Sequence, residues 1–192
     1  MSRVYIETYG CALNQADSET IAGLLQADGF CLTQSIHQAE LIIINTCTVK
    51  KRTYLNFVKR LKELRRLRRP LIVAGCVPSV YAESPLLKDV SFIGVNEVNQ
   101  IVEVAHRVLA GELVQRKGSE VDRTRLLLPI ARANPVIEIV PIAQGCLGEC
   151  TYCQTRLARG RLHSYPVEHI LARIPVSYTH LRAHETSLHL VC

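Results

Sequence analysis

The sequence predicts an α/β fold built on a parallel sheet. Short β-branched runs alternate along the first part of the chain with segments whose apolar residues recur every three or four positions. The segments between successive runs are long enough to hold a helix, as parallel strands with right-handed crossovers require. With 192 residues, of which 48% are hydrophobic and 21% charged, the chain is expected to bury a sizeable core without disulfides.

Five strands are expected, separated by helices. The strands are RVYIET at 3–8, a weak strand at 30–34, ELIIIN at 40–45, PLIVAG at 70–75 and SFIGV at 91–95. The helices are one with Asn14 as its N-cap, one over 50–69, a short one bounded by prolines, and one over 97–110. If the five-stranded sheet has the flavodoxin-like order 2-1-3-4-5, its first, third and fourth strands are neighbours.

Cys11, Cys47 and Cys76, here called the scattered cysteines, each directly follow one of those three strands. Ligands of open parallel sheets bind beyond the carboxyl ends of the strands, so thiols dozens of residues apart would meet at one edge. Three convergent thiolates indicate a metal or cluster site, whereas one free cysteine is equally well explained as a small buried hydrophobic residue. Cys31 lies inside the expected second strand and is assigned to the core.

A second cysteine set lies in the stretch GCLGECTYCQ at 145–154, after a strand expected over 135–144. Its members, here called the loop cysteines, are Cys146, Cys150 and Cys153. Three thiols without a nearby fourth ligand suit a cubane iron-sulfur cluster with one open iron. Structural zinc has four ligands in a closed tetrahedron.

Tyr152 and His163, near the loop cysteines, bear on the choice between an iron-sulfur cluster and zinc. Tyr152 is expected to lean on the ligand that occupies the open iron. His163 is the one nearby candidate for a fourth zinc ligand, and zinc therefore stays open as an alternative.

Charge and hydropathy indicate the compartment and the kind of partner. No apolar run approaches the ~18 residues that span a bilayer, and the first residues lack the apolar part of a signal peptide, so a cytoplasmic protein without membrane attachment is expected. The net charge is +6, and ten of the 23 Lys and Arg lie between Lys50 and Arg69, which favours a polyanionic partner. The same helix is equally well explained as a solvated amphipathic one. Arg156, Arg159 and Arg161, beside the loop cysteines, are a second candidate patch for such a partner. They are equally well explained as contacts to cofactor carboxylate or to core carbonyls.

Both cysteine sets resemble those of a known family. C-x3-C-x2-C after a strand resembles the radical S-adenosylmethionine enzymes, and YIETYGCALNQADSE, NTCTV and AGC resemble the amino-terminal domain of the tRNA methylthiotransferases. IETYGCALN with QGCLGECTYCQTRLARGRLHSYP is similar to the archaeal and eukaryotic branch of that family. The resemblance runs from about residue 3 to about residue 174.

The resemblance implies an enzyme that adds a methylthio group to carbon 2 of N6-threonylcarbamoyladenosine in tRNA, next to the anticodon. The alternative substrate is N6-isopentenyladenosine. It implies two 4Fe-4S clusters, an auxiliary one held by the scattered cysteines and one held by the loop cysteines that cleaves S-adenosylmethionine. Asn14 would hydrogen-bond beside the first cluster. The implied partners are tRNA, an electron donor and a sulfur source.

The resemblance also divides the chain. It implies a methylthiotransferase domain over 1–112, a linker over 113–134 and the truncated first unit of a radical S-adenosylmethionine (β/α) barrel over 135–174. Residues 175–192 depart from the family and are interpreted as a foreign tail translated from sequencing-library adapter. Their histidines, His180, His184 and His189, and Cys192 are therefore not taken as a zinc site. A chain with one barrel unit is expected to be inactive, with aggregation-prone strand edges over 129–174.

Two other function classes stay open. One is a non-catalytic iron-sulfur module for electron transfer or binding, which would cycle between redox states without cleaving S-adenosylmethionine. The other is a zinc-dependent RNA-binding domain, which metal analysis would distinguish at once.

Overall fold

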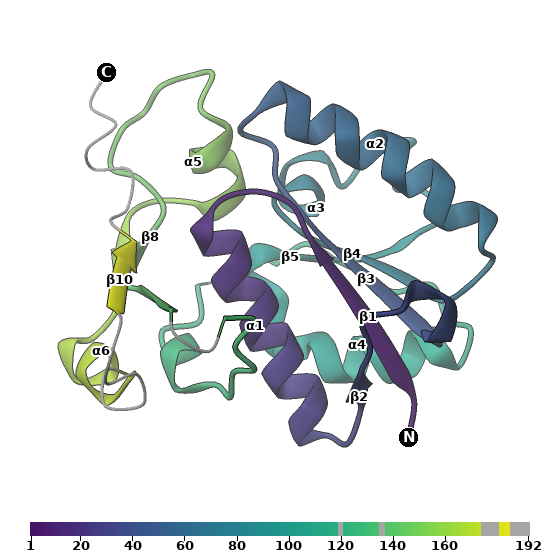
Figure 1. Ribbon diagram of the computed structural model, residues 1–192. Helices are drawn as coiled ribbons and strands as arrows, with labels where there is room; N and C mark the ends of the chain where they lie inside the picture. The colour runs from purple at the N-terminus through teal and green to yellow at the C-terminus, as the bar shows by residue number, and fades with distance from the viewer. Residues whose placement is uncertain (119–120, 135–136, 174–180, 185–192) are drawn as a thin grey trace.

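A parallel sheet forms the centre of the computed structural model, which describes residues 1–118, 121–134, 137–173 and 181–184 (Figure 1). The strands are β1 Arg3–Thr8, β2 Cys31–Leu32, β3 Leu41–Thr46, β4 Leu71–Gly75, β5 Ser91–Gly94 and β6 Gln115–Arg116. Their order, β2-β1-β3-β4-β5-β6, confirms the order predicted for the first five. The sheet has six strands rather than five, because β6 forms inside the segment expected to be a linker and pairs with β5.

Helices cover both faces of this sheet. They are α1 Ala12–Ala27, α2 Lys51–Arg66, α3 Cys76–Tyr81 and α4 Ile101–Leu109, with 3-10 turns η1 Ile36–Gln38 and η2 Val95–Gln100. α1 and α4 pack on one face, where Ile21 and Val104 join Ile43 in a buried cluster. α2 lies on the other face, where Phe57 packs with Ile44 (Figure 1). Covered from both sides, β3 is buried along its whole length, as parallel strands usually are.

Two local expectations are wrong. α1 begins at Ala12, so Cys11 takes the N-cap position and Asn14 lies buried in the first turn of the helix. Cys31, assigned to the core, is exposed. The reason is that β2 is a two-residue strand at the edge of the sheet, where few neighbours cover a side chain.

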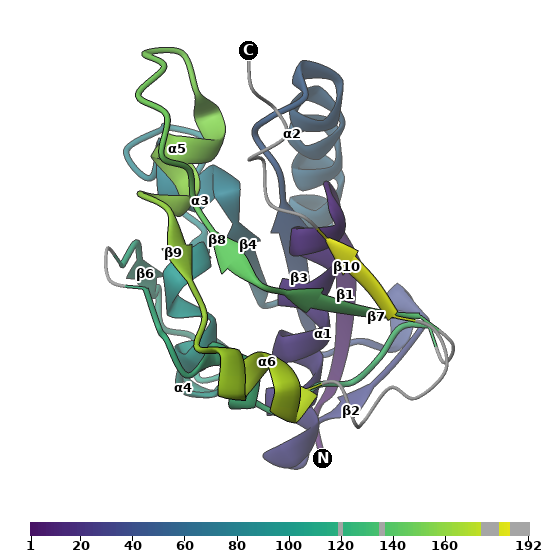
Figure 2. The same cartoon turned by 90° about the vertical axis from the view of Figure 1, so that its left-hand side faces the viewer.

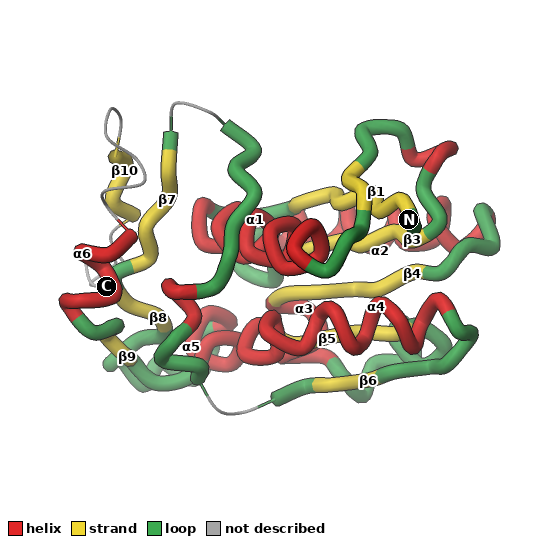
Figure 3. The backbone as a smooth tube through the Cα atoms, turned by 90° about the horizontal axis from the view of Figure 1, so that it is seen from below, coloured by secondary structure: helices red, strands yellow, loops and turns green. Residues whose placement is uncertain are grey.

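The rest of the described chain folds beside α1. It contains η3 Arg125–Leu127, β7 Glu138–Pro141, β8 Ala143–Gln144, α5 Gln154–Arg159, β9 His163–Ser164, α6 Val167–Arg173 and β10 Leu181–His184. β7 pairs in parallel with β10, and β8 pairs antiparallel with β9. Figures 2 and 3 show this part gathered at one end of the molecule, with β7 beside α1. The described residues form no closed barrel.

The structure describes most of the expected linker but only a short part of the expected tail. Within the linker, Ala131 N donates to Glu19 O at 2.9 Å, so this part of the segment is attached to α1. Of the expected tail, only 181–184 belongs to the described residues, and its backbone forms β10. The expectations for His180, His189 and Cys192 fall outside the described residues. In the described part of the chain no helix has the length and apolar character needed to cross a membrane.

Candidate metal centres

The scattered cysteines lie together at the carboxyl edge of the sheet. Cys11 follows β1, Cys47 follows β3, and Cys76 is the first residue of α3 after β4. Because β1, β3 and β4 are adjacent, their carboxyl ends deliver all three residues to one region. Cys47 and Cys76 are buried and Cys11 is exposed, so the group is reached from solvent on the side of Cys11.

The side chain of Asn14 lies among those of the three scattered cysteines. Cys11 Sγ donates to Asn14 Oδ1 at 3.4 Å, and Cys76 Sγ donates to the same oxygen at 4.0 Å. A Cβ atom placed on Gly10 would lie 2.7 Å from Cys47 Cβ and 3.0 Å from Asn14 Cγ. All three cysteines therefore border the space around the Asn14 amide.

The orientation of Asn14 is fixed by the neighbouring strand. Its Nδ2 donates to Thr46 O at 2.7 Å, and Asn45 Nδ2 donates to Asn14 O at 2.8 Å and to Ser18 Oγ at 2.9 Å. Since the amide nitrogen is engaged by Thr46, the amide oxygen faces the thiols as an acceptor.

The scattered cysteines suit a cluster better than a single ion. Within the described ranges, no three His, Cys, Asp or Glu side chains converge closely enough to hold one metal ion. A cubane cluster binds each thiolate at a separate iron, so its ligands are spread more widely. Cys11 occupies the N-cap position of the 16-residue α1, so its side chain lies at the positive end of the helix dipole. Beside Cys47, the buried Thr48 Oγ1 has no hydrogen-bond partner in the described part of the chain.

The loop cysteines lie between β8 and α5, and the loop curls around Gly148. Gly148 N donates to Cys146 Sγ at 3.3 Å, and a Cβ atom on Gly148 would lie 3.5 Å from Cys146 Sγ and 3.9 Å from Cys150 Sγ. Cys153 caps α5, and its N–H donates to Cys150 O at 3.1 Å. Cys150 is exposed and its two partners are half-buried, which leaves this set open to solvent.

Arg156 fixes the backbone of this loop. Its Nη1 donates to Gly148 O at 2.6 Å and to Cys146 O at 3.5 Å, and its Nη2 lies 3.5 Å from Glu149 Oε1. At this position the basic patch therefore contacts backbone carbonyls of the loop itself.

Tyr152 and His163 lie in different surroundings. Tyr152 is 72% exposed. His163 pairs with Gln144 across β8 and β9, and its ring meets Tyr165 edge-on with 5.4 Å between centroids. Burial lowers the pKa of His163, and the charge of Arg123 lowers it further. Among the described residues His163 belongs to no group of three His, Cys, Asp or Glu side chains that could hold one ion.

A buried ion network connects the two cysteine sets. Arg159, the last residue of α5, donates through Nη2 to Asp17 Oδ2 at 2.7 Å and to Asn14 Oδ1 at 3.4 Å. Arg125 donates to Asp17 Oδ1 at 2.6 Å. Sequence reasoning missed this network, although Asp17 lies one turn after Asn14 on the same side of α1, a spacing that could have indicated a shared polar face.

α5 packs directly on the site of the scattered cysteines. Ala158 joins Cys76 and Val95 in a buried cluster. Burial raises the pKa of the Cys76 thiol to about 11, and the Arg159 guanidinium opposes that rise. The helix that begins at a loop cysteine thus ends beside a scattered one.

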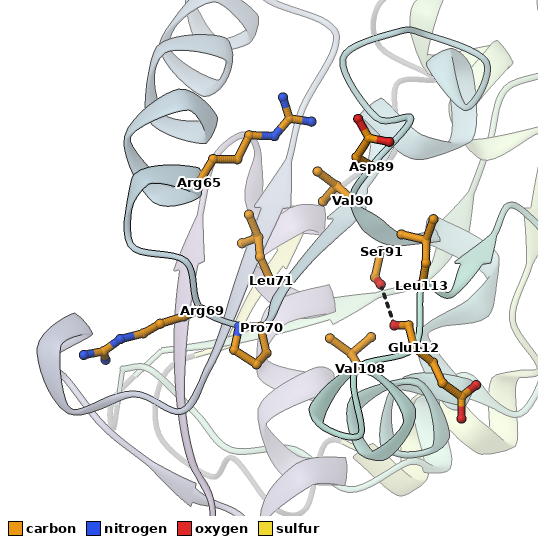
Figure 4. Close-up of a pocket in the computed structure, with 11 residues that line it drawn as sticks. Arg65, Arg69, Pro70, Leu71, Asp89, Val90, Ser91, Val108, Glu112 and Leu113 are labelled. Atoms are coloured by element: carbon orange, nitrogen blue, oxygen red, sulfur yellow. Dashed lines mark hydrogen bonds between the residues drawn. The ribbon is translucent and has the colours of Figure 1, made fainter.

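The opposite edge of the sheet carries a cavity of about 520 Å³ (Figure 4). It lies where β4 and β5 begin and where α2 and α4 end, between Leu71, Ser91 and Val108. Arg65 and Arg69 line it, yet they donate to the backbone carbonyls of Leu86, Ile36 and Ala39. Neither cysteine set lines this cavity, so the candidate chemistry belongs to the carboxyl edge.

Residues 3–94, which include all three scattered cysteines, match the model of the family described as Uncharacterized protein family UPF0004. The chain is 38%, 37% and 40% identical to the threonylcarbamoyladenosine tRNA methylthiotransferases of Danio rerio, Homo sapiens and Drosophila melanogaster. These alignments cover 93%, 93% and 92% of this chain and 34%, 32% and 33% of the relatives. The chain is therefore homologous to those proteins, as its motifs predicted, and spans about a third of their length.

Proposed function

We propose that this chain is the cluster-binding part of an enzyme that methylthiolates carbon 2 of N6-threonylcarbamoyladenosine in tRNA. The proposal rests on two separate groups of three cysteines in a chain homologous over 93% of its length to threonylcarbamoyladenosine tRNA methylthiotransferases. The scattered cysteines would hold an auxiliary 4Fe-4S cluster. The loop cysteines, on the first unit of a radical S-adenosylmethionine barrel, would hold a second one.

When bound, the two clusters would supply the electron that cleaves S-adenosylmethionine and the sulfur that is transferred. The residues of this chain hold and orient those groups. Asn14 presents its amide oxygen to the scattered cysteines, and Arg156 fixes the loop backbone. Tyr152 projects into solvent beside the loop cysteines, where it would lean on bound S-adenosylmethionine. An electron donor and a sulfur source are required as further partners.

α2 is the surface proposed for tRNA. Eight of the ten Lys and Arg between residues 50 and 69 are exposed, and α2 begins close to Cys47, at the edge where the scattered cysteines lie. Arg52, Lys59, Lys62 and Arg66 follow one another at helical spacing on an exposed face. A row of cations leading away from the cysteines suits a phosphate backbone, which it would position without reading sequence.

Replacing Lys59 and Lys62 together by glutamine is expected to weaken tRNA binding and to reduce its salt dependence. Each phosphate contact contributes about 0.7–0.9 to the slope of log affinity against log salt, so the slope should fall by roughly 1 to 2. Fluorescence anisotropy with labelled tRNA from 50 to 200 mM salt, taken as an order-of-magnitude range, measures it. Lys88→Gln with Lys117→Gln removes the same charge from exposed positions elsewhere. Equal losses in both pairs would mean that α2 is only a solvated face.

The function is tested by exchanging the amino-terminal third of the human relative for residues 1–173 of this chain. The chimera, reconstituted anaerobically with iron and sulfide, is given S-adenosylmethionine, a reductant and tRNA bearing N6-threonylcarbamoyladenosine. Mass spectrometry of the digested nucleosides should show the 2-methylthio derivative. The same chimera with Cys47→Ala should form none.

Other outcomes separate the alternatives. Sulfur transfer to N6-isopentenyladenosine alone would assign the other tRNA substrate. Loaded clusters that are reduced and reoxidised without cleavage of S-adenosylmethionine would favour an electron-transfer or binding module. Zinc in place of iron would overturn the proposal.

A further inference from the structure

Arg159 is the most deeply buried cation near the two cysteine sets. It is 2% exposed, and its guanidinium reaches Asp17 Oδ2 at 2.7 Å, Asn14 Oδ1 at 3.4 Å and Gln144 Oε1 at 3.5 Å. The Asn14 oxygen that it contacts is the same atom that accepts from Cys11. Arg159 therefore belongs to the shell around the scattered cysteines, although it comes from the helix behind the loop cysteines.

The charges of this network do not balance. The Asp17 carboxylate accepts from Arg159 and from Arg125, and all three side chains are less than a tenth exposed. In the described part of the chain neither guanidinium has a second carboxylate partner. A buried cation in excess is costly unless an anion compensates it. Asp17 supplies one such anion, and the same Nη2 of Arg159 contacts the Asn14 oxygen that accepts from the Cys11 and Cys76 thiols.

We propose that Arg159 is a positioning residue that supplies a fixed positive charge to the scattered-cysteine site and ties that site to the helix of the loop cysteines. An anionic iron-sulfur cluster bound by three thiolates is the ligand whose charge completes the network. This inference rests on the proposed function, because it requires a cluster at the scattered cysteines. A positive charge stabilises the reduced, more negative state of such a cluster and raises its reduction potential.

The test isolates the auxiliary cluster in the complete chain, with the loop cysteines replaced by alanine. After anaerobic reconstitution, titration with dithionite and redox mediators, followed by electron paramagnetic resonance, gives the reduction potential. Arg159→Met is expected to lower the ratio of reduced to oxidised cluster at least tenfold at a fixed potential, which corresponds to about 59 mV for one electron. Arg159→Lys should recover most of the loss.

Two further variants keep the inference falsifiable if Arg159→Met does not fold. Asp17→Asn keeps Arg159 but removes a negative charge, so the potential should move upward. Arg156→Met, on the same helix, removes a cation that contacts the loop backbone and not the scattered cysteines, and it should leave the potential unchanged. Iron that binds with a potential unmoved by Asp17→Asn, or moved as far by Arg156→Met as by Arg159→Met, overturns the inference alone. A parent chain that binds no iron overturns the proposed function as well.

Discussion

Replacing Cys11, Cys47 and Cys76 together by alanine is expected to halve the iron that the chain binds after anaerobic reconstitution. The parent should hold about eight irons in two 4Fe-4S clusters and the variant about four. The physical reason is that the scattered cysteines share one space around Asn14, while the loop cysteines enclose another around Gly148. Iron and sulfide determination, with absorption and electron paramagnetic resonance spectra, measures the change.

Cys31 provides the matched control for this experiment. It is also an exposed, free cysteine, but it pairs with Arg3 at the amino end of β1, on the edge of the sheet away from the scattered cysteines. Cys31→Ala should leave the iron content unchanged, whereas alanine at all three loop cysteines should halve it. Iron that survives the first triple substitution would mean that the convergence of the scattered cysteines has no role in cluster binding.

The convergence of the scattered cysteines was predictable because every step depends on local signals. Three of the five β-branched runs are each followed by a cysteine in a small-residue loop, and a parallel sheet brings the carboxyl ends of its strands to one edge. The order of the first five strands then follows from short, right-handed connections. The same reasoning places the loop cysteines at the end of a strand, which is where β8 leads into them.

Features that depend on contacts between residues far apart in the sequence could not be predicted from local sequence patterns. Arg159 and Asp17 are 142 residues apart in the chain, and Arg125 and Asp17 are 108 apart, so no periodicity relates them. β6 has two residues and is defined by its pairing with β5, whose other neighbour in the sheet is β4. Cys31 looked like a core residue because the expected strand was longer than the two residues that pair. In each case tertiary packing, not local propensity, decides the structure.

Asp17→Ala is expected to destabilise the chain by about 3–5 kcal/mol. Asp17 is 3% exposed and is the carboxylate partner of both Arg125 and Arg159, so its removal leaves two buried guanidinium groups without an anion. Denaturant unfolding followed by circular dichroism measures the free energy of unfolding. Asp28→Ala is the matched control: Asp28 pairs with His106 at 2.6 Å on the surface, where the loss should stay below about 1 kcal/mol.

The loss caused by Asp17→Ala should also depend on the state of the scattered cysteines. If an anionic cluster shares Arg159 with Asp17, the cluster compensates part of the charge that the substitution leaves unpaired. The destabilisation measured for the reconstituted chain should then be smaller than that measured for the same chain without iron. Equal losses in both states would show that the cluster and Arg159 do not interact, and a loss as small as that of Asp28→Ala would show that the buried network contributes little to the fold.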